Sequence, residues 1–245
     1  MTLLLIGLIA LGFVLGAALW NLSEIGLGKG SRQLHPACRK CGSALPATTW
    51  LPLGGFLTAW RCRSCGVSQS RIRLVWEIGV AIYFFLLGWK WDDSRQLVFA
   101  AISAVPLLLI LVIDLRGNVL YLNSIVLALV VATVLGFIDG PRSMGSAMVG
   151  LIAGIAITIA FFALSRWVFR SMNFKVSAIG VGDIYIAAAV GAIVRGDGIV
   201  PAFVIAVILA VSASVFLPIV SRSARQHATA YGPFLCIGGL VTLLL

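Results

Sequence analysis

Long apolar stretches recur along the whole chain and are separated by short polar segments. Each stretch is about 15–22 residues long, which suits a helix that crosses a hydrocarbon core of roughly 30 Å. The mean hydropathy of +1.10 and the charged fraction of 11% are far from the averages of soluble proteins. The alternating strand pattern of a transmembrane barrel is absent from the sequence. The sequence therefore predicts an all-α membrane protein, a polytopic bundle of about eight transmembrane helices.

The apolar stretches also divide the chain into three parts. The expected spans are residues 3–20, 74–89, 97–113, 119–138, 144–164, 184–194, 199–220 and 234–245. Only the polar insert between the first two spans, residues 21–73, is long enough for a separate small domain. The predicted organisation is therefore a first transmembrane helix over 1–20, an insert domain over 21–73, and a membrane-embedded helical bundle over 74–245.

The net charge of +10 raises the question of nucleic-acid binding, but the positions of the charges argue against it. The basic residues lie between apolar stretches, where they orient a protein in a membrane. The loops after the second, fourth and sixth spans hold only Lys90, Arg95, Arg142 and Arg195, and the remaining basic residues lie in the alternate loops. This asymmetry places the alternate loops in the cytoplasm and both termini outside.

Two aspartates stand at the ends of predicted spans. Asp114 closes the apolar run 100–113, and Asp183 opens the run 184–194 as the last residue of the motif Gly-Val-Gly-Asp that begins at Gly180. An acid in a membrane is energetically costly and suggests a function. The alternation of spans places both acids at the cytoplasmic end. If they approach closely, they should share a proton, so that one activates water and the other protonates the leaving group.

Structural roles for the same aspartates remain alternatives. Aspartate is a common N-cap residue, so Asp183 alone could serve only to cap its helix. Asp114 could pair with Arg116 at the membrane interface. Gly180 and Gly182 lack side chains and would allow the close approach of an extended substrate backbone.

Four cysteines form a second motif in the insert. They are arranged as C-x2-C, twenty residues, C-x2-C, at positions Cys38, Cys41, Cys62 and Cys65. Two such pairs can close a tetrahedral four-thiolate zinc site, and a redox-active pair is the alternative. A site with four thiolates has no open position for water, so the predicted zinc is structural. The 21–73 segment is therefore predicted to be a cytoplasmic zinc-type domain.

Three further residues are candidates for contact with a substrate. Glu77 lies one turn into the second span on the cytoplasmic side, where it could bond the active site or a substrate amine, or cap its helix. Gly232 and Pro233 lie in the segment that opens the last span at the same face. A proline in a first helical turn is also ordinary, so its presence alone indicates only a helix start.

The whole pattern resembles the type IV prepilin peptidase family, membrane-embedded aspartic peptidases of the GxGD class. The resemblance covers nearly the whole chain and rests on motifs that occur in order. These are the tetracysteine insert, Leu74-Val75-Trp76-Glu77, Ile113-Asp114-Leu115-Arg116, Gly180-Val181-Gly182-Asp183, and Tyr231-Gly232-Pro233-Phe234-Leu235, the last of which is similar to F-G-P-F-L.

The resemblance implies a prepilin leader peptidase of the bacterial inner membrane, with Asp114 and Asp183 as the catalytic pair facing the cytoplasm. The expected partners are a prepilin or pseudopilin substrate and the lipid bilayer, and no nucleic acid. It also implies that the enzyme N-methylates the new amino terminus with S-adenosylmethionine. The sequence shows no Gly-rich cofactor loop on a strand, and the insert between the cysteine pairs is too short for a doubly wound nucleotide fold.

The sequence departs from the family pattern in two places. Tyr185 stands where the family usually has Lys, two residues after the second aspartate, and Leu120-Tyr121-Leu122 replaces an I-P-D segment. Two other functions are alternatives to the peptidase. A non-catalytic membrane adaptor would dock a pilus or secretion assembly partner through its zinc module. A proton-coupled transporter would use the acids as a relay, but both acids are expected at one face and none lies in mid-span.

Overall fold

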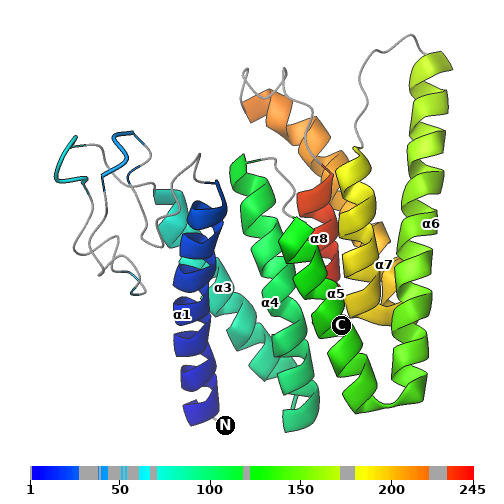
Figure 1. Ribbon diagram of the computed structural model, residues 1–245, viewed down its shortest axis with the longest axis horizontal. Coiled ribbons are helices and arrows are strands. Elements are labelled where there is room, and N and C mark those ends of the chain that lie inside the picture. The colour runs from blue at the N-terminus through cyan, green and yellow to red at the C-terminus, as the bar shows by residue number, and fades with distance from the viewer. Residues whose placement is uncertain are drawn as a thin grey trace. The chain divides into compact units, whose positions relative to one another are not determined.

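The computed structural model describes residues 2–27, 38, 40–43, 51, 53, 61–66, 71–117, 122–171, 180–220 and 231–245. The regular elements among these residues are all α-helices (Figure 1). They are α1 (Thr2–Leu27), α3 (Arg71–Lys90), α4 (Ser94–Gly117), α5 (Leu122–Asp139), α6 (Pro141–Ser171), α7 (Val181–Val220) and α8 (Gly232–Thr242). Within the described ranges, six helices are long and apolar enough to cross a membrane, and α8 is a shorter apolar helix. The predicted all-α membrane fold is confirmed.

The longest helix, α7, consists of two helical halves that meet at Arg195. Figure 1 shows that the second half runs back toward the end of the bundle where the first half begins. The predicted spans 184–194 and 199–220 correspond to these two halves. With the halves taken separately, the described helices agree with the predicted number of about eight.

The bend in α7 has a strained backbone that its neighbours hold. Arg195 has φ 65° and ψ −178°, a conformation that is unfavourable for any residue with a Cβ atom. Its guanidinium lies 2.8 Å from the Asp139 carboxylate at the end of α5. The next backbone N–H, of Gly196, donates to the Ser146 hydroxyl of α6 at 3.1 Å. These two bonds tie the bend to both preceding helices and offset part of the strain.

The first helix continues past its predicted end at residue 20. Residues 21–27 were expected to belong to the insert, but α1 extends to Leu27. No proline interrupts this stretch, and the Ser23 hydroxyl donates to the Trp20 carbonyl within the helix at 2.7 Å. Because the polar side chains find partners, the helix does not need to stop where the apolar sequence stops. Asn21 is completely buried.

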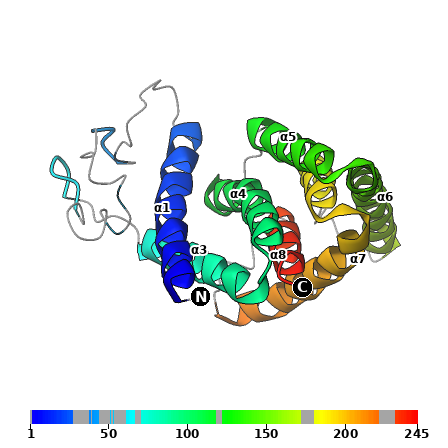
Figure 2. The ribbon, with the colours of Figure 1, turned by 90° about the horizontal axis from the view of Figure 1, so that it is seen from below.

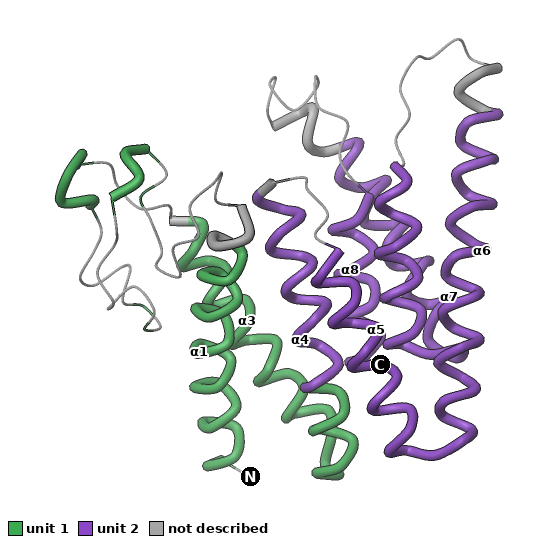
Figure 3. The backbone as a smooth tube through the Cα atoms, viewed as in Figure 1, with its two compact units in different colours: residues 1–101 green, residues 102–245 purple. Residues whose placement is uncertain are grey.

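The chain forms two compact units, residues 1–101 and 102–245 (Figure 3). In unit 1, α1 packs closely on α3 through its glycines. A Cβ atom on Gly12 would lie only 2.6 Å from the Ala81 Cα, and one on Gly16 would lie 3.1 Å from the Glu77 Cα. The Trp76 indole nitrogen donates to the Gly16 carbonyl at 3.1 Å. The predicted division of the chain after residues 20 and 73 stays a prediction.

In unit 2, α8 is packed against α7 and α4, as Figure 2 shows from below. A Cβ atom on Gly239 would lie 3.0 Å from Val190 of α7 and 3.2 Å from Leu107 of α4. A Cβ atom on Gly238 would overlap the carbonyl oxygen of Ala202, in the second half of α7. This packing buries the short helix and fixes its first turn against the ends of α4 and α7.

Helices α6 and α7 also approach each other at glycines. A Cβ atom on Gly150 would overlap the carbonyl oxygen of Gly191, and one on Gly154 would overlap the carbonyl of Ala187. Small residues that allow helix backbones to touch are a common basis of helix association in membranes, where van der Waals packing replaces the hydrophobic effect.

This contact gives a matched pair of substitutions within α6. We expect Gly150→Ala to lower stability by about 1–3 kcal/mol, because the added methyl group forces the two backbones apart. Gly145 has no atom within 4 Å of an added Cβ. Gly145→Ala should therefore be neutral, or stabilising by up to about 1 kcal/mol through helix propensity. Thermal unfolding of the detergent-solubilised protein measures both, and equal melting temperatures for the two variants would contradict the packing.

Candidate active site and cysteine cluster

The two aspartates come from different helices of unit 2 and are both buried. Asp114 lies in the last turns of α4 and Asp183 in the first turn of α7. Each is only 7% exposed. Figure 1 shows that these ends of α4 and α7 lie at the same end of unit 2, where α8 also begins. Helix packing therefore gathers the two acids and the start of α8 in one region.

The backbone at Gly232 brings the two carboxylates into one site. A Cβ atom on Gly232 would overlap the Asp114 Oδ2 atom and would lie 2.6 Å from Ile186. The Asp183 carboxylate also interacts with the Gly232 backbone, and the two acids interact electrostatically. Glycine is therefore required at this position for a steric reason, since any side chain would displace the Asp114 carboxylate.

The GxGD motif forms a compact helix start. The Gly180 backbone N–H donates to Asp183 Oδ2 at 2.8 Å, and the Asp183 N–H donates to the Gly180 carbonyl at 3.1 Å. The first of these bonds is one half of a capping box, in which the side chain of the third helical residue accepts from the N-cap N–H. Gly180 has no side chain to form the other half, and its backbone carbonyl accepts from Asp183 instead. Asp183 thus has a structural role as well as its place beside Asp114. A Cβ atom on this exposed glycine would make only ordinary contacts, the nearest at 3.9 Å to the Gly182 backbone nitrogen.

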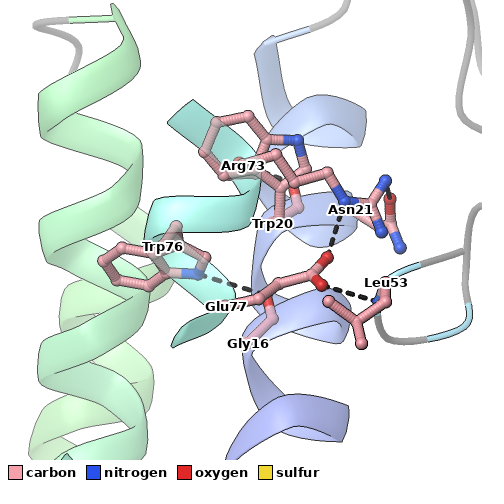
Figure 4. Close-up of polar contacts among 8 residues, drawn as sticks. Gly16, Trp20, Asn21, Leu53, Arg73, Trp76 and Glu77 are labelled. Atoms are coloured by element: carbon pink, nitrogen blue, oxygen red, sulfur yellow. Dashed lines mark hydrogen bonds and ion pairs between the residues drawn. The ribbon is translucent and has the colours of Figure 1, made fainter. Parts of the chain in front are cut away.

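Glu77 lies in a buried polar network of unit 1, drawn in Figure 4. The side chain is 1% exposed. Arg73 Nε lies 2.7 Å from Glu77 Oε1, and the Leu53 backbone N–H donates to Oε2 at 2.8 Å. Arg73 Nη1 also lies 3.5 Å from the Asn21 Oδ1 atom of α1. Glu77 therefore joins α3 to α1 and to the insert, and its contact with a substrate stays a prediction.

The network gives a test of stability. Glu77→Gln should leave the Arg73 charge buried without its counter-ion, at a cost of about 3–5 kcal/mol. The double variant Arg73→Met with Glu77→Gln should recover most of this loss, because it removes the buried charge and keeps an acceptor for Leu53. Melting temperatures in detergent measure the effect. A Glu77→Gln variant as stable as the wild type would show that the ion pair is not a determinant of the fold.

The four cysteines of the insert lie together. The Sγ atoms of Cys38, Cys41, Cys62 and Cys65 are all within 4.8 Å of one another. Cys38 Sγ lies 3.6 Å from Cys65 Sγ, and Cys41 Sγ lies 3.6 Å from Cys62 Sγ. Four thiolates about 2.3 Å from a tetrahedral zinc ion would be about 3.8 Å apart. The cluster fits a four-thiolate zinc site, as predicted, and the four cysteines are not joined by disulfides.

Two glycines outside the predicted set of site residues determine the backbone shape of this cluster. Gly42 has φ 70° and Gly66 has φ 69°, a left-handed conformation that favours glycine. The Gly42 N–H donates to the Cys38 carbonyl and the Gly66 N–H to the Cys62 carbonyl, each at 2.8 Å. Each pair therefore forms the same tight turn. The sequence signal was present, because both pairs read C-x2-C-G.

Ser43 is a further residue that sequence reasoning missed. Its hydroxyl lies 3.0 Å from the Cys41 sulfur and 3.3 Å from the Cys62 sulfur. Hydrogen bonds from this hydroxyl and from the Cys65 and Ser64 backbones lower the pKa of the Cys62 thiol to about 5. Hydrogen bonds to Ser43 also lower the pKa of Cys41. Because the thiolate is the form that binds metal, these bonds favour metal binding near neutral pH.

The metal prediction is tested by elemental analysis. We expect the purified wild-type protein to carry one zinc per chain and Cys62→Ser to lose it, because three thiolates hold zinc far less tightly than four. Cys236→Ala is the matched control. Cys236 is buried in α8, far along the chain from the cluster, and this variant should keep its zinc. Wild-type protein free of zinc after purification without chelators would contradict the prediction.

Comparison with known proteins identifies relatives along most of the chain. The chain is 28% identical over 206 residues to the type 4 prepilin-like proteins leader peptide-processing enzyme of Escherichia coli O78:H11, covering 82% of this chain and 70% of that protein. It is 24% identical over 201 residues to the prepilin leader peptidase/N-methyltransferase of Dickeya chrysanthemi, covering 82% and 68%. A similar enzyme of Pseudomonas putida is 24% identical over 213 residues, covering 84% and 70%.

The fold and the site together define a class of protein. They describe an all-helical, multi-pass membrane protein with a buried aspartate pair and a tetracysteine cluster. Residues 12–91 match the profile of the Bacterial Peptidase A24 N-terminal domain. Over most of its length the chain is similar to prepilin leader peptidases. No solved structure matches it significantly.

Proposed function

We propose that this protein is a membrane-embedded aspartic endopeptidase that removes the leader peptide from type IV prepilins or pseudopilins. The observation that carries the proposal is the meeting of two buried aspartates, from separate helices, at the backbone of Gly232. The names of the relatives in Escherichia coli and Dickeya chrysanthemi describe the same activity.

The chemistry follows from the proximity of the two acids. Two neighbouring carboxyl groups hold one proton between them more readily than none, and the proton belongs to the pair rather than to either residue. The ionised member takes a proton from water while the water oxygen attacks the scissile carbonyl carbon. The protonated member then gives its proton to the leaving amine as the carbon–nitrogen bond breaks. Asp114 and Asp183 together supply both roles.

The surrounding residues are proposed to position the substrate. Gly180 is exposed and its backbone N–H donates to Asp183, so an extended substrate strand could approach its backbone beside the acid. Gly182 follows it in the first turn of α7. Gly232 holds the Asp114 carboxylate in place, and Pro233 lies in the first turn of α8 as expected. Glu77, which its network holds in unit 1, is proposed as a further contact for the substrate.

We place the protein in the bacterial cytoplasmic membrane with the acid pair facing the cytoplasm. The excess of basic residues in alternate loops supports this orientation. A leader with basic residues ahead of an apolar helix would then be cut where it leaves the membrane. The zinc-type insert would lie on the same side, in a reducing compartment that favours thiolates over disulfides.

N-methylation of the new amino terminus is a second proposed activity, supported by the names of the relatives in Dickeya chrysanthemi and Pseudomonas putida. S-adenosylmethionine would supply the methyl group. Among the described residues we find no strand and no glycine-rich loop of the kind that cradles a nucleoside. We therefore assign no residue to this cofactor and derive no step through it.

The peptidase is tested by cleavage of a leader-bearing prepilin with the detergent-solubilised protein, followed by mass spectrometry. Asp114→Asn and Asp183→Asn should each reduce cleavage by at least roughly 10³-fold, because the pair acts as a unit. Both variants should keep their zinc and their helical content, which separates lost catalysis from lost folding. Wild-type cleavage that persists in both variants would contradict the acid-pair mechanism and would favour the adaptor. An added methyl group on the product, dependent on S-adenosylmethionine, would establish the second activity.

A further inference from the structure

Tyr231, the residue before α8, has a buried hydroxyl group without a hydrogen-bond partner among the described residues. The residue is only 5% exposed. A phenol hydroxyl taken out of water normally finds a donor or acceptor, and leaving it unpaired is unfavourable. A buried unpaired group in a native fold therefore calls for an explanation, and a functional role is one of the recognised explanations.

The fold accounts for the ring of Tyr231 but not for its hydroxyl. The ring stacks on Phe161 of α6 with a centroid distance of 5.8 Å and an interplanar angle of 28°. Its carbonyl accepts the backbone N–H groups of Phe234 at 3.1 Å and Leu235 at 3.2 Å. A phenylalanine would satisfy all these contacts equally well. The hydroxyl is therefore the one part of the side chain that these contacts leave unexplained.

The hydroxyl lies in the electrostatic field of the acid pair. Tyr231 directly precedes Gly232, whose backbone contacts both carboxylates. Burial and the charge of Asp183 raise the pKa of Tyr231 to about 12. The group therefore stays protonated near neutral pH and remains a hydrogen-bond donor. It interacts with Asp183 through space without a hydrogen bond to it, so it can donate a hydrogen bond to a further polar group.

We propose that the Tyr231 hydroxyl donates a hydrogen bond to the carbonyl oxygen of the scissile peptide bond. This inference rests on the proposed peptidase function and adds a catalytic residue to it. When water attacks the carbonyl carbon, negative charge develops on that oxygen. A donor held by packing and shielded from water stabilises such charge strongly, because it needs no reorganisation during the reaction. The unpaired hydroxyl of the substrate-free protein is then a donor that is held ready for the transition state.

The test is steady-state kinetics of prepilin cleavage by the full-length protein in detergent, with melting temperatures measured alongside. Tyr231→Phe removes one oxygen atom and keeps the ring. We expect kcat to fall roughly 100–1,000-fold with little change in KM, as for the loss of one oxyanion donor. We also expect the melting temperature to rise by about 2–4 °C, because a buried unpaired group is removed. Tyr83→Phe in α3 is the matched control and should leave kcat unchanged.

The other possible results distinguish a failure of this inference from a failure of the peptidase proposal. Unchanged kcat in Tyr231→Phe, with an active wild type, overturns this inference alone and leaves the peptidase standing. A fall in both kcat and melting temperature would show that the hydroxyl has a structural partner, and would also overturn it. An inactive wild type, tested on several prepilins, would overturn the peptidase proposal and this inference with it. An Asp183→Asn variant run in parallel confirms that the measured cleavage depends on the acid pair.

Discussion

The contact of the Gly232 backbone with Asp114 and Asp183 is the interaction on which the site depends. Carboxylates in a membrane protein are costly unless something holds and solvates them. Here the backbone at the start of α8 contacts both carboxylates, and only a glycine at position 232 leaves space for them. The packing of α8 on α4 and α7 therefore serves the chemistry, because a shift of this short helix would remove the backbone contact that the two acids share.

Close helix contact at small residues makes this arrangement possible. Gly150 lies against Gly191, and Gly238 lies against Ala202, so α6, α7 and α8 approach at backbone distance. In lipid, association between helices gains little from the hydrophobic effect and depends on such fitted surfaces. The strained bend at Arg195 also contributes to this close packing, because it lets the second half of α7 return along the bundle and pack on α8. The bonds to Asp139 and Ser146 offset what the bend costs.

The sequence predicted the features that depend on local pattern. The apolar stretches, the four cysteines and the two aspartates at span ends are each visible in a short window, and the structure shows the helices and gathers the cysteines. Features that depend on distant partners were not predicted. The buried pairing of Arg73 with Glu77 requires Leu53 and α1 beside it, and the extension of α1 to Leu27 depends on the burial of Asn21. The Tyr231 hydroxyl had no signal beyond a single departure from phenylalanine.

The buried polar groups of the two units differ in a way that separates structure from function. In unit 1, Arg73 and Glu77 neutralise each other and share bonds with Leu53 and Asn21, as expected of a group that holds a fold. In unit 2, two acidic side chains lie together and a nearby phenol has no partner among the described residues. A fold selected for stability alone would replace such groups with apolar ones, since a half-satisfied cluster is worse than none. Their retention at one end of unit 2 is explained if a substrate completes the bonding there.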